Sequence, residues 1–183
     1  IVNTADREVT FELRHNGHQL ATTGEQLVQE VRGLPDEEPG EPFERKLWRF
    51  VRDGSYHFDP LTASTWQHDP LLFLNSVGFG FCDDVAAVYA TLGSQAGYPV
   101  RVWDLTGHAV PEIDAGGRWS VYDPDLAVYY KNLDGNVAGF AELKETPDLI
   151  LVPIEPISRD PFPYSHYVSE AYATTGDNRM IGM

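Results

Sequence analysis

Apolar side chains recur every three to four residues along the segment 82–96, and this spacing predicts an amphipathic helix. Gly78 and Gly80 indicate a tight turn immediately before the helix. Gly97 and Pro99 indicate its end, because glycine and proline commonly follow a helix C-terminus. The apolar face of this helix comprises Val85, Ala86, Tyr89, Leu92 and Ala96.

Three runs of strand-forming residues follow the helix, at 100–105, 108–113 and 118–123. The loop 114–117 between the last two runs is short and contains glycine, so it predicts a β-hairpin. The helix and these strands together predict an α+β fold, in which the cysteine-bearing helix packs on an antiparallel β-sheet. We see no second domain in the pattern, and we treat residues 1–183 as one domain.

The hairpin also predicts which side chains meet. If Ile113 faces Arg118, then His108 faces Asp123 directly, and the two share one face of the sheet because side chains alternate along a strand. Opposed residues have Cβ atoms roughly 4.5–5.5 Å apart, within reach of a hydrogen bond between imidazole and carboxylate. Pro111 can shift this register by forcing a bulge, because proline cannot donate to the ladder.

The rest of the chain carries weaker patterns. The segment 34–42 is acidic and rich in proline, and we interpret it as a solvated connector within the domain. A helix at 43–52 has an apolar face and basic residues opposite it. The remaining patterns predict a strand at 9–14 with a turn at Asn16-Gly17, a helix at 25–31, a strand at 126–130, a helical turn at 140–144 and a buried strand at 148–154.

Cys82 is the only cysteine, and it lies where the turn enters the helix. Free backbone N–H groups and the positive end of the helix dipole stabilise a thiolate at such a position. The alternative is a small buried hydrophobic residue. Asp83 and Asp84 support that alternative, because nearby negative charge raises a thiol pKa.

Cys82, His108 and Asp123 together offer the three groups of a thiol catalytic triad. The thiol attacks, the imidazole takes its proton, and the carboxylate holds the imidazole in the required tautomer. Taken singly, a histidine such as His108 more often has a structural role, and an aspartate such as Asp123 before Pro124 is more often a turn residue. Their predicted pairing favours the joint catalytic interpretation.

Four short motifs occur in order along residues 76–126, and they resemble those of the transglutaminase-like superfamily, which belongs to the wider papain-like fold. They are Gly80-x-Cys82-x-Asp84, Gly97-Tyr98-Pro99-Val100-Arg101, Gly107-His108-Ala109 closed by Glu112, and Trp119-x-x-x-Asp123-Pro124. The resemblance implies a cysteine protease, amidase or acyltransferase with Cys82 as nucleophile, His108 as base and Asp123 as orienting acid. One departure is Val110, where the family usually has tryptophan.

Papain-like enzymes add an upstream side chain to the backbone N–H of the cysteine to stabilise the oxyanion. On this resemblance Gln67 is our candidate for the second donor, with Trp66 and Asn75 as alternatives. The mechanism requires no cofactor and no metal. Asp123-Pro-Asp125 and Asp134-Gly-Asn136 are rich in oxygen ligands but do not match calcium-loop spacing, so we interpret them as turns.

The amino-acid composition limits the classes of partner that the protein is expected to bind. Hydrophobic residues make up 42% of the 183 residues, which suits a globular domain, and the formal net charge of −15 disfavours nucleic acid and anionic membranes. We expect no membrane insertion, because no apolar run is long enough. A single cysteine excludes an intrachain disulfide and a Cys-rich zinc site. The chain begins with Ile1 and not methionine, which is compatible with a domain excised from a longer protein.

Two hypotheses follow. The first is a thiol enzyme that hydrolyses or transamidates an amide or isopeptide bond in a peptide-like substrate, with hydrolysis as the default because water is abundant. The second is a catalytically silent binding or scaffold domain of a larger protein. The sequence does not indicate substrate, oligomeric state or cellular location.

Overall fold

The computed structural model describes residues 3–4, 6–9, 12, 14–15, 18–60, 65–105, 107–151 and 179–181. The helices are α1 (Gly24–Gly33), α2 (Phe43–Asp53), α3 (Pro70–Leu72), the π-helical turn η2 (Phe73–Val77), α4 (Cys82–Gln95), α5 (Phe140–Glu145), and the 3₁₀ turns η1 (Thr65–His68) and η3 (Pro147–Leu151). None of the described helices has the length and apolar character needed to cross a membrane.

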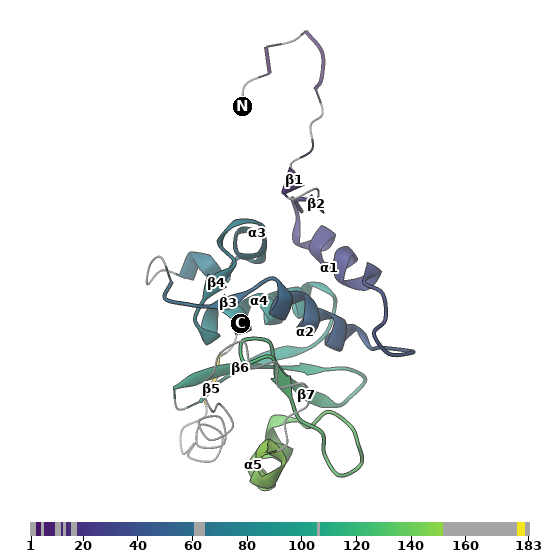
Figure 1. The fold of residues 1–183 in the computed structure, drawn as a ribbon, viewed down its shortest axis with the longest axis vertical. Coiled ribbons are helices and arrows are strands. Elements are labelled where there is room, and N and C mark those ends of the chain that lie inside the picture. Colours follow the sequence, from purple (N-terminus) through teal and green to yellow (C-terminus); the bar gives the residue numbers. More distant parts are fainter. Residues whose placement is uncertain are drawn as a thin grey trace.

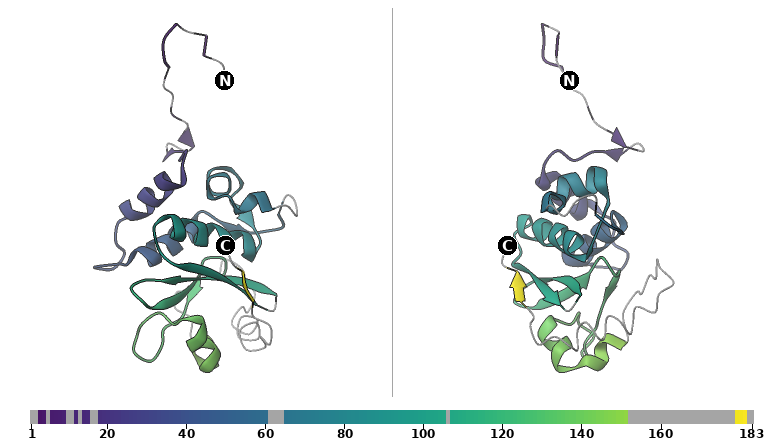
Figure 2. Two further views of the ribbon diagram at one scale, coloured as in Figure 1. Left: turned by 180° about the vertical axis from the view of Figure 1, so that it is seen from behind. Right: turned by 90° about the vertical axis from the view of Figure 1, so that its left-hand side faces the viewer.

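An antiparallel sheet has the strand order β8-β7-β6-β5-β9. Its strands are β5 (Val100–Leu105), β6 (His108–Asp114), β7 (Trp119–Asp123), β8 (Val128–Tyr129) and β9 (Arg179–Ile181). Two short pairs lie outside it: β1 (Arg14–His15) with β2 (His18–Gln19), and β3 (Tyr56–His57) with β4 (Phe79–Gly80). Strand β9 joins the outer edge of β5 and brings the C-terminal end of the chain to the sheet (Figure 2).

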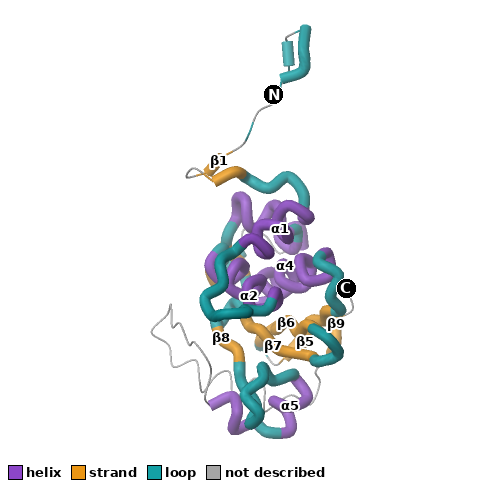
Figure 3. The backbone as a smooth tube through the Cα atoms, turned by 90° about the vertical axis from the view of Figure 1, so that its right-hand side faces the viewer, coloured by secondary structure: helices purple, strands orange, loops and turns teal. Residues whose placement is uncertain are grey.

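The architecture is a layered α+β arrangement (Figure 1). Helices α2 and α4 cover one face of the sheet, α1 packs on these two helices, and α5 lies on the other face, as the tube in Figure 3 also shows. Each interface has its own apolar core. One joins Leu47, Trp48 and Tyr89 of the helices to Ile113 and Tyr122 of the sheet. The other joins Val110 and Val121 of the sheet to Phe140 and Leu143 of α5.

The predicted elements around the cysteine are confirmed. Helix α4 begins at Cys82, and β5 has the predicted bounds. Helix α1 begins after Thr23, whose side chain accepts a hydrogen bond from the Gln26 N–H. The predicted buried strand at 148–154 is wrong where the structure describes it, because residues 147–151 form η3. Residues 152–154 lie outside the described part, as do several residues of the predicted strand 9–14 and the turn Asn16-Gly17.

The predicted hairpin exists, but its register is shifted by two residues. Ile113 pairs with Ser120 and not with Arg118. The turn causes the shift: Gly117 N–H donates to the Asp114 side chain, and the Ala115 N–H donates to the Arg118 carbonyl, which places residues 115–118 in the loop. A shift of two residues keeps every side chain on its expected face, whereas a shift of one would reverse them all.

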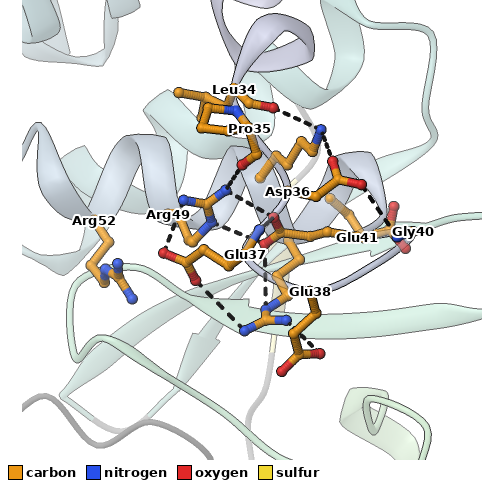
Figure 4. A network of polar contacts seen from close by, with 12 residues as sticks. Leu34, Pro35, Asp36, Glu37, Glu38, Gly40, Glu41, Arg49 and Arg52 are labelled. Carbon is orange, nitrogen blue, oxygen red and sulfur yellow. Dashed lines mark hydrogen bonds and ion pairs between the residues drawn. The ribbon is translucent and has the colours of Figure 1, made fainter.

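The connector 34–42 is not simply solvated, and Figure 4 shows why. Glu41 is buried, and its carboxylate accepts two hydrogen bonds from Arg49, at 2.9 and 2.8 Å. Arg45 pairs with Glu37 and Glu38, while Arg49 also donates to the Pro35 carbonyl. The acidic connector therefore covers the basic face of α2. We interpreted the acidic segment and the basic helix face separately, and neither pattern alone predicts that they pair.

Two of the sequence motifs meet across the sheet. Glu112 is fully buried and accepts hydrogen bonds from Arg101, from the Trp103 indole and from the backbone N–H of Phe140. The Arg101 guanidinium also lies 3.8 Å from the centre of the Trp119 ring. Burying a carboxylate is costly unless it is paired. The arginine of the second motif and the glutamate of the third therefore form one structural unit.

Candidate active site

The turn that presents Cys82 is held by Asp84. The Asp84 carboxylate accepts a hydrogen bond of 3.0 Å from the backbone N–H of Phe81, the residue before the helix. A Cβ atom at Gly80 would lie 2.5 Å from Asp84 Oδ2 and 2.8 Å from its Cβ. Glycine is therefore required at position 80, and Gly80-x-Cys82-x-Asp84 is one capping structure. Burial raises the pKa of Asp84, and the charge of Asp83 acts in the same direction.

Helix α4 packs closely on β6 through small side chains. Ala86 and Ala90 of the helix meet Ala109 and Val102 of the sheet, with Cys82 at the edge of this cluster. The close approach lets the backbone N–H of Ala109 donate to Cys82 Sγ at 3.3 Å. Cys82 remains partly exposed. The sulfur is therefore both accessible and in contact with the strand that carries His108.

His108 is the first residue of β6 and Asp123 is the last of β7, so antiparallel pairing brings them to the same end of the sheet. His108 Nε2 lies 2.6 Å from Asp123 Oδ2, and both residues are buried. In the observed register they are not directly opposite. Diagonal neighbours on one face are about 7–8 Å apart at the backbone, which long side chains can span.

Asp123 is held from two further directions. Its Oδ1 accepts a hydrogen bond of 3.0 Å from the backbone N–H of Leu126. Its own carbonyl accepts a hydrogen bond of 2.9 Å from the indole Nε1–H of Trp48, a fully buried residue of α2. Because Asp123 contacts Nε2 of His108, Nδ1 is the ring nitrogen that remains for an interaction with the Cys82 sulfur.

The electrostatics of His108 favour a charged imidazolium. Burial by itself lowers the pKa of His108, but the negative charge of Asp123 and its hydrogen bond outweigh burial, and the interaction with Cys82 adds to them. The net result is a His108 pKa well above the ordinary value of 6.5. A protonated imidazole beside a sulfur stabilises a thiolate.

One residue of the site was missed by sequence reasoning. A carboxylate oxygen of Asp125, a ring nitrogen of His108 and Sγ of Cys82 all lie within 4.8 Å of one another. Asp125 is in turn paired with His57, whose Nδ1 lies 3.0 Å from each carboxylate oxygen. The sequence of Asp123-Pro-Asp125 indicates only an oxygen-rich turn. No sequence signal links it to His57, 68 positions away.

Sulfur, imidazole nitrogen and carboxylate oxygen are donors that zinc accepts in proteins. Cys82, His108 and Asp125 therefore have the composition of a three-ligand group, and His68, Asp83 and Asp84 form a second group within 4.8 Å among the described residues. His68 Nε2 lies 3.4 Å from Asp84 Oδ1 and extends the capping structure of α4. His57 and His68 therefore each have a carboxylate partner, Asp125 and Asp84 respectively.

The oxyanion candidates are placed as follows. Gln67 is fully buried, and its Nε2 donates to the Phe79 carbonyl at 3.2 Å, which supports the strand before the cysteine turn. Its Oε1 has no hydrogen-bond partner among the described residues. Asn75 instead donates to the Ala21 carbonyl, and the Trp66 side chain lies outside the described part. The Gln67 amide has two N–H donors, and the one that does not bind the Phe79 carbonyl has no acceptor among the described residues.

Large aromatic side chains are exposed on the segments beside Cys82. Tyr56 and Phe58 are 67% and 65% exposed, and Phe81, directly before Cys82, is 40% exposed. The ring of Phe81 lies 5.8 Å from that of His57. Val110, the departure from the family pattern, is fully buried in the core against α5. The departure from the family pattern at position 110 therefore lies in the core and not among the exposed aromatic side chains beside Cys82.

Comparison of the chain with models of protein families, with curated proteins and with solved structures found no match. The site must therefore be interpreted from its own geometry.

Proposed function

We propose that the protein is a thiol-dependent acyl-transfer enzyme with a papain-like, transglutaminase-like core. Cys82 is the nucleophile, His108 the general base and Asp123 the group that orients the imidazole. Two contacts of one imidazole carry the proposal. His108 Nε2 lies 2.6 Å from Asp123 Oδ2, and a ring nitrogen of His108 lies within 4.8 Å of Sγ of Cys82, the only cysteine in the chain.

The reaction starts with the Cys82 thiolate and the His108 imidazolium. The sulfur attacks the carbonyl carbon of an amide, and the developing oxyanion is stabilised by the backbone N–H of Cys82 at the start of α4 and, as a second donor, by Gln67. His108 gives its proton to the leaving amine, which departs as the thioester forms. Water, which loses its proton to His108, then cleaves the thioester; an amine in place of water gives transamidation.

The surrounding residues support these roles. The Asp123 carboxylate pairs with His108 and accepts a hydrogen bond from the Leu126 N–H, and the Asp123 backbone carbonyl accepts one from the Trp48 indole. These contacts hold the carboxylate in place while the imidazole changes its protonation state. Pre-organised groups of this kind reduce the rearrangement needed during reaction. The backbone N–H of Ala109 donates a hydrogen bond to the sulfur and so helps to hold Cys82 beside the strand that carries His108.

The proposal is tested by the rate of iodoacetamide alkylation of Cys82 as a function of pH. Since Cys82 is the only cysteine, incorporation reports on one site. Unactivated thiols have a pKa of about 8.5, and activated ones of about 3.5–7.5. We expect fast alkylation that persists below neutral pH in the wild type and is lost in His108→Ala. His68→Ala is the matched control, because His68 also pairs with a carboxylate but through Asp84.

Slow alkylation with an ordinary alkaline midpoint, unchanged in His108→Ala, would contradict the proposal. It would favour the second candidate, a silent binding domain, for which the exposed rings of Tyr56 and Phe58 are the specific observation. Cys82→Ala separates the two in the cell. An enzyme loses its role with the sulfur, whereas a binding domain keeps it.

A further inference from the structure

A second imidazole–carboxylate pair adjoins the proposed nucleophile. The Asp125 side chain is only 2% exposed, and one of its oxygens lies within 4.8 Å of Cys82 Sγ and of a His108 ring nitrogen. His57, on β3, covers the carboxylate from outside, with its Nδ1 3.0 Å from both oxygens and its side chain 49% exposed. This pair has no part in the mechanism described above.

The position of Asp125 is chemically unusual. A carboxylate beside a thiolate and a developing oxyanion repels both, so it weakens the proposed reaction unless it has a favourable role. Its acceptor capacity is also incompletely used. A carboxylate can accept about four hydrogen bonds, whereas the described residues supply one N–H to Asp125, from His57. An unsaturated, buried acceptor therefore faces the reacting atoms.

We propose that Asp125 binds a primary ammonium group carried by the carbon next to the attacked carbonyl, so that the acyl donor is an aminoacyl group with a free α-amine. This inference rests on the proposed function and specifies its substrate class. Asp125 is a specificity-determining residue, and His57 is a positioning residue that holds the carboxylate toward the sulfur.

The geometry accommodates this substrate. With N–Cα and Cα–C bonds of about 1.5 Å each, the α-nitrogen lies roughly 3–4 Å from a sulfur bonded to the carbonyl carbon. A hydrogen bond from that nitrogen, about 2.7–3.2 Å long, reaches a carboxylate oxygen that lies within 4.8 Å of the same sulfur.

His57 and Asp125 act on a bound cation with opposite sign. The Asp125 charge attracts an ammonium, and a protonated His57 offsets that charge. Asp125→Asn therefore weakens the preference for a cation, whereas His57→Gln, which removes the charge of His57 and retains an N–H donor, strengthens it. A purely structural role for the pair would move both variants in the same direction.

The first experiment needs no natural substrate. It compares the rates at which 2-aminoethyl and 2-sulfonatoethyl methanethiosulfonate modify Cys82; in each case the thiolate forms a disulfide and methanesulfinate leaves. We expect the ratio of cationic to anionic rates to fall about five- to tenfold in Asp125→Asn, the range expected for one unit charge a few ångströms away and partly screened. The ratio should rise in His57→Gln. Asp83→Asn, which removes an exposed carboxylate adjacent to Cys82 in sequence, is the control.

The second experiment identifies the source of the ammonium. It compares nitrophenol release from the p-nitrophenyl esters of glycine and of N-acetylglycine. Faster acylation by the free glycyl ester, lost in Asp125→Asn, supports recognition of the acyl donor. Equal acylation by both esters, with turnover accelerated by added ethylamine only when Asp125 is present, would overturn the inference in favour of the acyl acceptor.

Failure of the inference differs from failure of the proposed function. If the wild type reacts rapidly but its ratio of cationic to anionic modification rates equals those of Asp125→Asn and His57→Gln, the recognition role of Asp125 is refuted. The assignment of Cys82 as the nucleophile is then unaffected. If Cys82 reacts slowly with both reagents and His108→Ala changes nothing, the enzyme itself is refuted.

Discussion

Replacing Trp48 by phenylalanine tests the connection between the helical layer and the triad. The substitution removes the 2.9 Å hydrogen bond from the indole to the Asp123 carbonyl and retains an aromatic ring in the core. Leaving a buried acceptor without its partner costs about 1–3 kcal/mol. The smaller ring adds a cavity cost of about 1 kcal/mol. We therefore expect the free energy of unfolding to fall by about 2–4 kcal/mol.

Urea unfolding of the wild type and Trp48→Phe measures this loss, with the denaturant slope as a check that both unfold to similar states. The same variant should also slow alkylation of Cys82 below neutral pH, because Asp123 loses one of its three supports. Trp103→Phe is the matched control. Its indole also donates to a buried acceptor, Glu112 at 2.7 Å, but this contact lies away from the triad.

The two readouts separate positioning from stability. Trp103→Phe should lower stability by a comparable amount and leave the pH dependence of alkylation unchanged. A loss below about 1 kcal/mol in Trp48→Phe would show that the hydrogen bond is dispensable. An equal loss of thiol reactivity in both variants would show that the effect is general weakening of the core, and the positioning argument would then be wrong.

Three further predictions concern charge and turn geometry. Gly80→Ala should lower the free energy of unfolding by about 1–3 kcal/mol in thermal or urea denaturation, since rotating the Asp84 carboxylate cannot relieve a contact of 2.8 Å with its Cβ; no loss would contradict the capping role. Glu41→Gln should cost about 3 kcal/mol because it removes the buried carboxylate that Arg45 and Arg49 share and leaves them only the more exposed Glu37 and Glu38. Glu38→Gln, at an exposed carboxylate, should cost less than about 1 kcal/mol; equal effects would refute the distinction. The hydrogen bond that the His57 ring donates to the Asp125 carboxylate raises the pKa of His57 above 6.5 despite partial burial, so NMR titration should find its midpoint above that value and Asp125→Asn should lower it. Because the folded-state pKa is the higher one, this pair contributes stability that is present below pH 6.5 and lost as pH rises through the raised pKa.

Local patterns predicted the elements that carry the site. Helix α4, strand β5 and the hairpin β6–β7 follow from the period of apolar residues and from the glycines between them, which are properties of short segments. The shared face of His108 and Asp123 was also predictable, because alternation along a strand survives a register shift of two residues. The contact at 2.6 Å therefore occurs although the predicted pairing of Ile113 with Arg118 is wrong.

Local sequence patterns did not determine the strand register or the type of every element, which depended on hydrogen bonds within turns and on packing. The register depended on which hydrogen bonds Asp114 and Arg118 make within the turn. Residues 149–151 are apolar in sequence but belong to a 3₁₀ turn beside α5. A short apolar run by itself does not distinguish such a turn from a buried strand. The Gly80–Asp84 pair was visible as a motif, yet its physical reason appeared only when the missing Cβ could be placed against the carboxylate.

Contacts between distant segments were settled only by the folded chain. Trp48 reaches Asp123 across 75 positions, His57 reaches Asp125 across 68, and the acidic connector buries Glu41 against the arginines of α2. Periodicity and turn signals describe a few consecutive residues and carry no information on which helix face meets which strand end. That choice is made when the apolar faces pack together, and it brings the second carboxylate to the thiol.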